Sequence, residues 1–237
     1  MFSTSKLQRD RELRSWWTIA AGFLLALQPL AAQVGLGLSP MRVEMRLAPG
    51  ASHTGTLRLV NEGALTRVRS SLLDFHLDAE QTPQFEEQLA EEAAYSCRGW
   101  LSVNPMETEL KVSGETAVRY TLRVPADAQP RSYYCAAGFT SLPPAFELNG
   151  FGIRSAVRIV GAFYVIVGNP VVQGRLSQIE MEHVPGSNDW RAVVVLENFG
   201  NMFFRPTGTV EVLDPGGKVT ESYEITPLPV LPERKQR

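Results

Sequence analysis

The sequence predicts an all-β protein built around a sandwich of two sheets. The clearest strand is residues 117–123, where Val118, Tyr120 and Leu122 alternate with polar residues and so fall on one face. The 16 prolines and 19 glycines recur between such runs as turn residues. Tyr133 lies two residues before Cys135, which is the spacing of the tyrosine corner in immunoglobulin-like sandwiches. We therefore predict an immunoglobulin-like β-sandwich, with a simple β-hairpin as the alternative for this stretch.

Length and charge narrow the choice of domain organisation and partner. The 237 residues suffice for two sandwich domains of about 100 residues each, or for one large domain. The net charge of −2 indicates neither a nucleic-acid binder nor a strongly acidic tail. No internal apolar run reaches the roughly 20 residues that a membrane-spanning helix needs.

The N-terminus has the pattern of a secretory signal peptide. Basic residues precede an apolar run at 16–27, and the small pair Ala31 and Ala32 follows it. We predict a cleaved signal peptide at residues 1–32 and a periplasmic or secreted mature chain. The alternative is an uncleaved N-terminal anchor, although the apolar run is short for a membrane span.

Export gives the two cysteines a predicted role. An oxidising compartment favours a disulfide between Cys97 and Cys135, which would stabilise the fold by roughly 4 kcal/mol in the chain-entropy model. Two cysteines without histidine neighbours make a poor metal site. The alternative is a pair of buried free thiols.

Further strands are expected on both sides of the opening stretch. Apolar alternation or flanking turn residues indicate strands at 41–47, 54–61, 66–77 and 100–105. The last of these begins with Trp100, which we expect to be a core side chain. Residues 80–94 break the pattern with several glutamates. We expect a solvated loop or a short helix there, with an acidic docking site as the alternative.

The longest apolar run, residues 155–167, is predicted to be a strand with two apolar faces. It follows a loop at 142–152 whose Phe146 and Phe151 either fold over the core or contact a partner. A strand that is apolar on both faces lies in the centre of the fold, lies between domains, or presents its edge to a ligand.

A second and shorter β domain is predicted after the linker at 168–170. Four strands are expected, at 171–182, 190–197, 207–213 and 219–225, before prolines lead into a basic tail. The predicted domains are thus a sandwich at 33–168 and an incomplete sandwich at 169–237. An incomplete sandwich exposes unpaired backbone groups, so we expect it to self-associate or to accept a strand from a partner.

A search for catalytic groups finds none, and we predict that the protein is not an enzyme. The three histidines, His53, His76 and His183, lack the spacing of metal ligands. Ser71, Asp74 and His76 are crowded along one strand, where alternate residues point to opposite faces. We predict no catalytic residue, no metal, no cofactor and no small-molecule substrate.

Several segments together resemble the N-terminal domain of PapD-like periplasmic pilus chaperones and of related exported bacterial proteins. They are SPMRVEM, LRLVNEG, VRYTLRVPADAQPRSYYCAA and RIVGAFYVIVGNP, in that order. The resemblance implies a seven-stranded sandwich whose last long strand completes a partner subunit by strand addition. It implies that Arg42 holds the C-terminal carboxylate of the subunit by a charge-assisted contact. The donor residues that it implies are Val157, Ile159, Phe163 and Val165.

Two functions are therefore predicted. The first is a chaperone-like protein that binds a secreted or envelope subunit of the pilus type. The alternative is a non-catalytic structural module of a cell-envelope complex. Gly161 and Ala162 stand where the pilus chaperones have a lysine, which favours the alternative.

Overall fold

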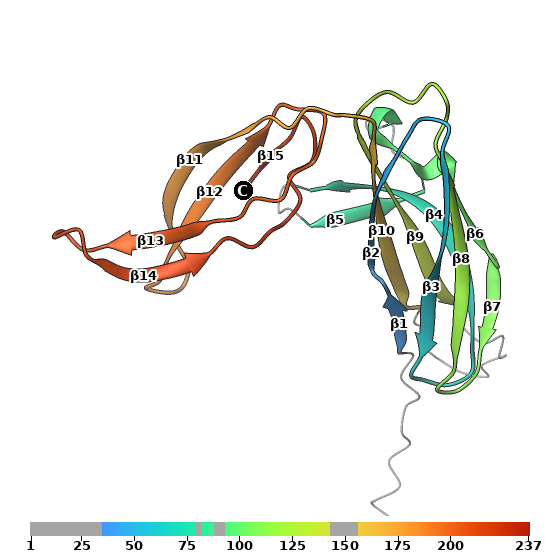
Figure 1. Cartoon of the computed structure of the whole chain (residues 1–237). Coiled ribbons are helices and arrows are strands. Elements are labelled where there is room, and N and C mark those ends of the chain that lie inside the picture. Colours follow the sequence, from blue (N-terminus) through green and yellow to red (C-terminus); the bar gives the residue numbers. More distant parts are fainter. Residues whose placement is uncertain (1–34, 79–81, 88–92, 143–155) are drawn as a thin grey trace, which may run out of the picture. The chain divides into compact units, whose positions relative to one another are not determined.

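A computed structural model describes residues 35–78, 82–87, 93–142 and 156–237. The predicted signal peptide lies outside the described residues, as does most of the loop that contains Phe146 and Phe151. Strands are the main regular structure of the described part, beside two short 3-10 helices, in agreement with the predicted all-β fold. Figure 1 shows the strands with the labels used below.

Two sheets form the predicted β-sandwich, and ten strands contribute to them (Figure 1). One sheet has the order β1-β3-β8-β6. The other has the order β2-β10-β9-β4, and both β5 and β7 pair with the far edge of β4. The bounds are β1 Leu36–Ser39, β2 Arg42–Leu47, β3 Ser52–Asn61, β4 Thr66–Leu77, β5 Pro83–Glu86, β6 Leu101–Asn104, β7 Glu107–Leu110, β8 Glu115–Arg123, β9 Ser132–Leu142 and β10 Arg158–Val167.

The core lies between these two sheets, where the alternating apolar residues meet. Val118, Tyr120 and Leu122 of β8 are buried there, as the alternation in that strand predicts. They face Phe139 of β9 and Phe163 of β10, both fully buried. A second cluster covers the other face of β9 and β10 and includes Tyr134, Tyr164, Phe203 and Leu231. Each of the two apolar faces predicted for residues 155–167 therefore contacts a buried cluster.

Three short elements differ from the sequence prediction. Residues 83–86, expected in a loop or short helix, form strand β5, because Phe85 packs on Phe75 of β4 with ring centroids 5.6 Å apart. Residues 79–81 and 88–92 of the same acidic stretch lie outside the described residues. The strand expected from Trp100 begins one residue later, since Trp100 ends the 3-10 helix η2 (Arg98–Trp100) and is only half buried. A second 3-10 helix, η1, spans Ala93–Tyr95.

The C-terminal strands form two further small sheets. Strands β11 (Gly174–His183), β12 (Trp190–Asn198) and β15 (Lys235–Gln236) make one, and β13 (Thr209–Leu213) pairs with β14 (Val219–Glu224) in the other. The four predicted strands are present with small shifts in their ends. Lys235 and Gln236 of the basic tail pair with Glu197 and Leu196, and so add a short strand that the sequence pattern does not predict.

Candidate functional site

The candidate site is the first half of β10, which has a partner on only one side. Strand β9 pairs with β10 from Arg158 to Ile166, whereas β2 pairs with it only from Ala162 onward. Among the described residues, no strand therefore pairs with residues 158–161 on the β2 side. We call this stretch the open edge of β10.

Two residues direct their backbone polar groups toward the open edge. The amide of Ala162 donates to the Met41 carbonyl at 2.9 Å, so residue 162 faces the β2 side. The Val157 carbonyl accepts from the Ser141 amide at 2.8 Å, so residue 157 faces β9. Because successive residues of a strand alternate in direction, the N–H and C=O groups of Arg158 and Val160 face the open edge.

The predicted donor residues lie in both halves of β10, and only some of them are at the open edge. Val157 and Ile159 lie at or beside the open edge and are half buried. Phe163 and Val165 are 0% exposed in the core between the two sheets, and they lie in the half of β10 that β2 already pairs with. Their side chains fill the protein's own core, and a contact of these two residues with a partner stays a prediction.

Arg42 lies at the point where the open edge ends. It is the first residue of β2, directly opposite Ala162 of β10, and its side chain is 61% exposed. Its Nε lies 3.3 Å from Oε1 of Glu44, the next residue on the same face of the strand. The guanidinium is therefore accessible to solvent but already has one carboxylate beside it.

Arg205 contacts the same carboxylate and was not predicted from the sequence. Its Nη1 lies 2.7 Å from Glu44 Oε1, and its side chain is mostly buried against the rings of Tyr164 and Phe203. Its Nε is buried without a hydrogen-bond partner. Burial in this cluster raises the pKa of the Tyr164 hydroxyl above its ordinary value. Two guanidinium groups thus share one carboxylate at the end of the open edge.

Gly161 lies against the side chain of Leu38, which leaves little room for a side chain at this position. A Cβ built on Gly161 would point toward the core and lie 3.1 Å from Cδ2 of Leu38. A longer side chain would have to displace that buried leucine. The local packing of β1 against β10 therefore favours a small residue at this position.

Strand β9 supports β10 and is itself fastened at two points. Cys97 and Cys135 form a disulfide whose Cα atoms are 5.2 Å apart. The Tyr133 hydroxyl donates to the Gln129 carbonyl at 3.1 Å, which is the contact of a tyrosine corner, and its ring packs on Trp100. These contacts anchor the start of β9, beside the half of β10 that β2 also pairs with.

The described part of the chain contains neither a metal-binding cluster nor a membrane-spanning helix. Within it, no group of three or more histidine, cysteine, aspartate or glutamate side chains is arranged to hold a metal ion. No helix there has the length and apolar character needed to span a membrane.

Comparison with known proteins gives structural matches only. No protein-family model and no curated protein sequence matches the chain. A chaperone–tip adhesin complex of CFA/I fimbriae biogenesis matches with 10% identity and a TM-score of 0.49, over 85% of this chain and 84% of the other. The Pseudomonas aeruginosa chaperone CupB2 matches with 15% identity and a TM-score of 0.47, over 84% of both chains. The E. coli chaperone DraB matches with 18% identity and a TM-score of 0.44, over 86% and 83%.

The low identities and TM-scores of these matches leave the function to be argued from the chain's own open edge and charges.

Proposed function

We propose that the protein is an exported, chaperone-like protein that binds a secreted or envelope subunit, of the pilus type, by β-strand addition at the open edge of β10. The observation that supports this most is that Arg158 and Val160 pair with β9 on one side but have no strand among the described residues to pair with on the other. An extended segment placed there would lie in line with β2 and satisfy their N–H and C=O groups.

The proposal includes a direction for the added strand. Strand β2 runs parallel to β10 and begins at Arg42. A segment that runs the same way along the open edge therefore ends next to Arg42. A C-terminal carboxylate at that end would meet an exposed guanidinium, and such charge-assisted contacts are stronger than neutral ones.

A structural module of an envelope complex is the second candidate. The observation that favours it is the Glu44 carboxylate, which Arg42 and Arg205 already share. In a structural module this cluster would serve only to hold β2, Tyr164 and Arg205 together, and no partner carboxylate would enter.

The decisive variants change the open edge without disturbing the core. Arg158→Pro removes an N–H that faces the open edge and places a ring against an incoming strand, and proline is tolerated at the start of an edge strand. Arg158→Ala is the matched control, since it removes the same exposed side chain and its contact with Thr140 but keeps the N–H. Arg42→Ala tests the carboxylate contact separately.

The measurement is a pull-down from a periplasmic extract with the purified protein, followed by mass spectrometry. We expect a secreted subunit to co-purify with the wild type and with Arg158→Ala, and to be lost or strongly depleted with Arg158→Pro and Arg42→Ala. Equal recovery of the same proteins with all four would favour the structural module instead.

A further inference from the structure

Two arginines at the end of the open edge carry more positive charge than the carboxylate between them balances. Arg42 Nε and Arg205 Nη1 lie 3.3 and 2.7 Å from the same oxygen, Oε1 of Glu44. Among the described residues, no other carboxylate lies within 4.0 Å of either guanidinium. Two positive charges and one negative charge leave this group of three side chains with a net charge of +1.

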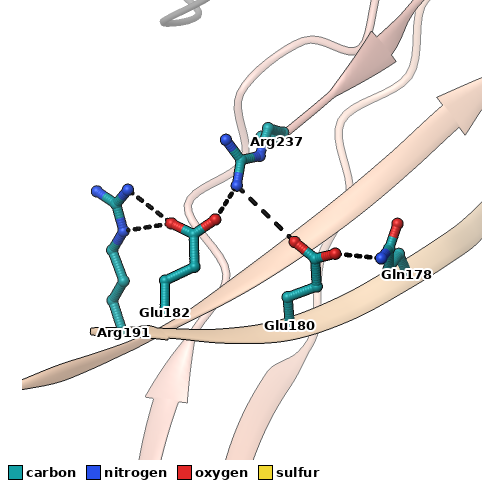
Figure 2. Close-up of polar contacts among 5 residues, drawn as sticks. All are labelled: Gln178, Glu180, Glu182, Arg191 and Arg237. Carbon is teal, nitrogen blue, oxygen red and sulfur yellow. Dashed lines mark hydrogen bonds and ion pairs between the residues drawn. The ribbon is translucent and has the colours of Figure 1, made fainter. Parts of the chain in front are cut away.

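Another arginine pair in the chain shows a balanced arrangement (Figure 2). Arg191 holds one oxygen of Glu182 at 2.7 Å, while Arg237 reaches the other oxygen and lies 3.9 Å from Glu180. The hydrogen bond from Arg191 lowers the pKa of Glu182 below its ordinary value. Two guanidinium groups thus meet two carboxylates there. The arginine pair on Glu44, by contrast, has the charge to bind one more carboxylate.

Arg205 is a fixed and poorly solvated cation. Its guanidinium carbon lies 5.0 Å from the ring centroid of Tyr164 and 5.1 Å from that of Phe203. Only 16% of its side chain is exposed. Contact with two aromatic rings fixes the position of a guanidinium group. A charge that is largely removed from water also attracts an anion more strongly than an exposed charge does, because less solvent screens it. Arg205 is therefore preorganised to bind a carboxylate.

The Glu44 carboxylate lies close to the point at which an added strand would end. Arg42 begins β2 opposite Ala162, directly after the open edge of β10. Glu44 is two residues further along β2, on the same face, and its carboxylate reaches back to Arg42. A segment added in line with β2 therefore brings its C-terminal carboxylate next to the position that the Glu44 carboxylate occupies.

Glu44 can leave this position at a small cost in free energy. Its side chain is 36% exposed and lies on β2, which pairs only with β10 among the described strands. The side chain can therefore rotate into water, where its charge is hydrated. The ion pair that it loses with Arg42 is solvent-exposed and contributes little. The contact that it loses with Arg205 is replaced by the incoming carboxylate.

We infer that Arg42 and Arg205 together form a carboxylate-binding site, which Glu44 occupies in the free protein and leaves when a ligand enters. The identity of the ligand rests on the proposed function: it is the C-terminal carboxylate of the segment that is added to β10. Pairing of the segment with β10 raises the local concentration of its carboxylate, which lets it displace Glu44. Free carboxylates in solution lack this advantage and are largely excluded.

Acetate tests the site without strand addition. The readout is the NMR signal of the Arg205 Nε–H, which burial protects from rapid exchange with water. The Nε–H signal of Arg191 is the control in the same sample, because Glu182 already balances that guanidinium. Glu44→Gln removes the competing charge and keeps the size of the side chain.

We expect acetate to shift the Arg205 signal to saturation in Glu44→Gln, and the wild type to need at least about tenfold more acetate. The Arg191 signal should not saturate, nor should the Arg205 signal when chloride replaces acetate at the same ionic strength. Equal acetate affinity with and without Glu44 would overturn the inference, as would the absence of saturation in Glu44→Gln.

Two fluorescein-labelled peptides test the ligand, with fluorescence anisotropy as the readout. Both alternate valine and threonine, and they differ only in a free or an amidated C-terminus. We expect the wild type to bind the free acid more tightly than the amide, and Glu44→Gln to raise this ratio at least about fivefold. Arg205→Met, which removes the charge, should lower the ratio, and Arg205→Lys, which keeps the charge, should preserve more of it.

The outcomes separate this inference from the proposed function. Glu44→Gln changes an exposed side chain, so it decides the question even if a variant of the buried Arg205 is unstable. A ratio that Glu44→Gln leaves unchanged would overturn the inference, while binding of both peptides that Arg158→Pro abolishes would still support strand addition at β10. Failure of both peptides to bind any of these proteins would contradict strand addition, and the acetate titration would then decide alone whether the arginine pair binds a carboxylate.

Discussion

The strands before residue 168 and the strands after it alternate apolar and polar residues in the same way. They differ in how deeply their apolar side chains are buried. Between the first two sheets Leu57, Phe139 and Phe163 are fully buried. In the C-terminal sheets Ile179, Trp190 and Tyr223 remain more than half exposed. Only Phe203 and Leu231 of the C-terminal part join a buried cluster, and that cluster lies on β9 and β10.

The difference shows that alternation determines a strand but not its burial. An apolar face is buried only when a second layer covers it. The first two sheets cover each other, whereas β13 and β14 leave the apolar face of β11 and β12 partly open. The predictions below test this contrast, beginning with the largest expected effect.

Removing a large side chain should affect the two regions very differently. Phe139→Ala is expected to lower the free energy of unfolding by about 3–5 kcal/mol, because it leaves a cavity between two packed sheets. Tyr223→Ala, in an exposed strand, should change it by about 0.5 kcal/mol or less. Urea unfolding measures both. Similar losses for the two variants would contradict the contrast.

The disulfide should stabilise the first region alone. Replacing both Cys97 and Cys135 by alanine is expected to cost about 2–4 kcal/mol, since the unfolded chain regains the freedom of a loop with a sequence separation of 38. Amide hydrogen exchange should become faster in β9, and exchange in β12 should stay as in the wild type. Equal acceleration in both strands would show that the two regions unfold together.

The hydrogen bond of the tyrosine corner should make a smaller difference to the free energy of unfolding. Tyr133→Phe removes the hydrogen bond to the Gln129 carbonyl and should lower the free energy of unfolding by about 1 kcal/mol. Tyr223→Phe, whose hydroxyl contacts Glu221 on the surface, is the matched control and should have almost no effect. Chemical denaturation of the two variants decides the point.

The last effect is expected from pH, through a contact between the two regions. The Tyr95 hydroxyl donates to Glu233 Oε1 at 2.8 Å, and burial, together with this hydrogen bond, raises the pKa of Tyr95 to about 12. The folded state therefore favours the neutral phenol. Its contribution to stability is present below the ordinary tyrosine pKa of 10.0 and is lost as the pH rises toward 12.

The matched variant for this pH effect is Tyr95→Phe. The difference in free energy of unfolding between wild type and variant should shrink as the pH is raised from 10 to 12. A difference that stays constant over this range would contradict the assignment, since other buried tyrosines titrate equally in both proteins.

Much of the fold could be predicted from local patterns. Alternation placed β8, β9 and β10, and the spacing of Tyr133 and Cys135 indicated the corner. The strands that were missed are short and depend on a neighbour. Strand β5 is held by Phe75, and β15 by two residues of β12. Both strands are too short to show an apolar alternation in their own sequences.

The candidate site was predicted only in part, and the reason is register. Apolar alternation identifies β10 but cannot tell which half β2 pairs with, so Phe163 and Val165 were expected at an edge that begins before them. Arg205 is far from Arg42 in the sequence, and no local pattern connects them. Only the folded chain places both guanidinium groups on Glu44.

The most direct test of the open edge of β10 is hydrogen exchange of individual backbone amides, measured by NMR in the free protein. The account predicts that the amides of Arg158 and Val160 exchange fast, while those of Ala162 and Tyr164, which face β2, are protected. Protection of Arg158 and Val160 equal to that of Ala162 would mean that another part of the chain already covers the edge, and strand addition at β10 would be contradicted.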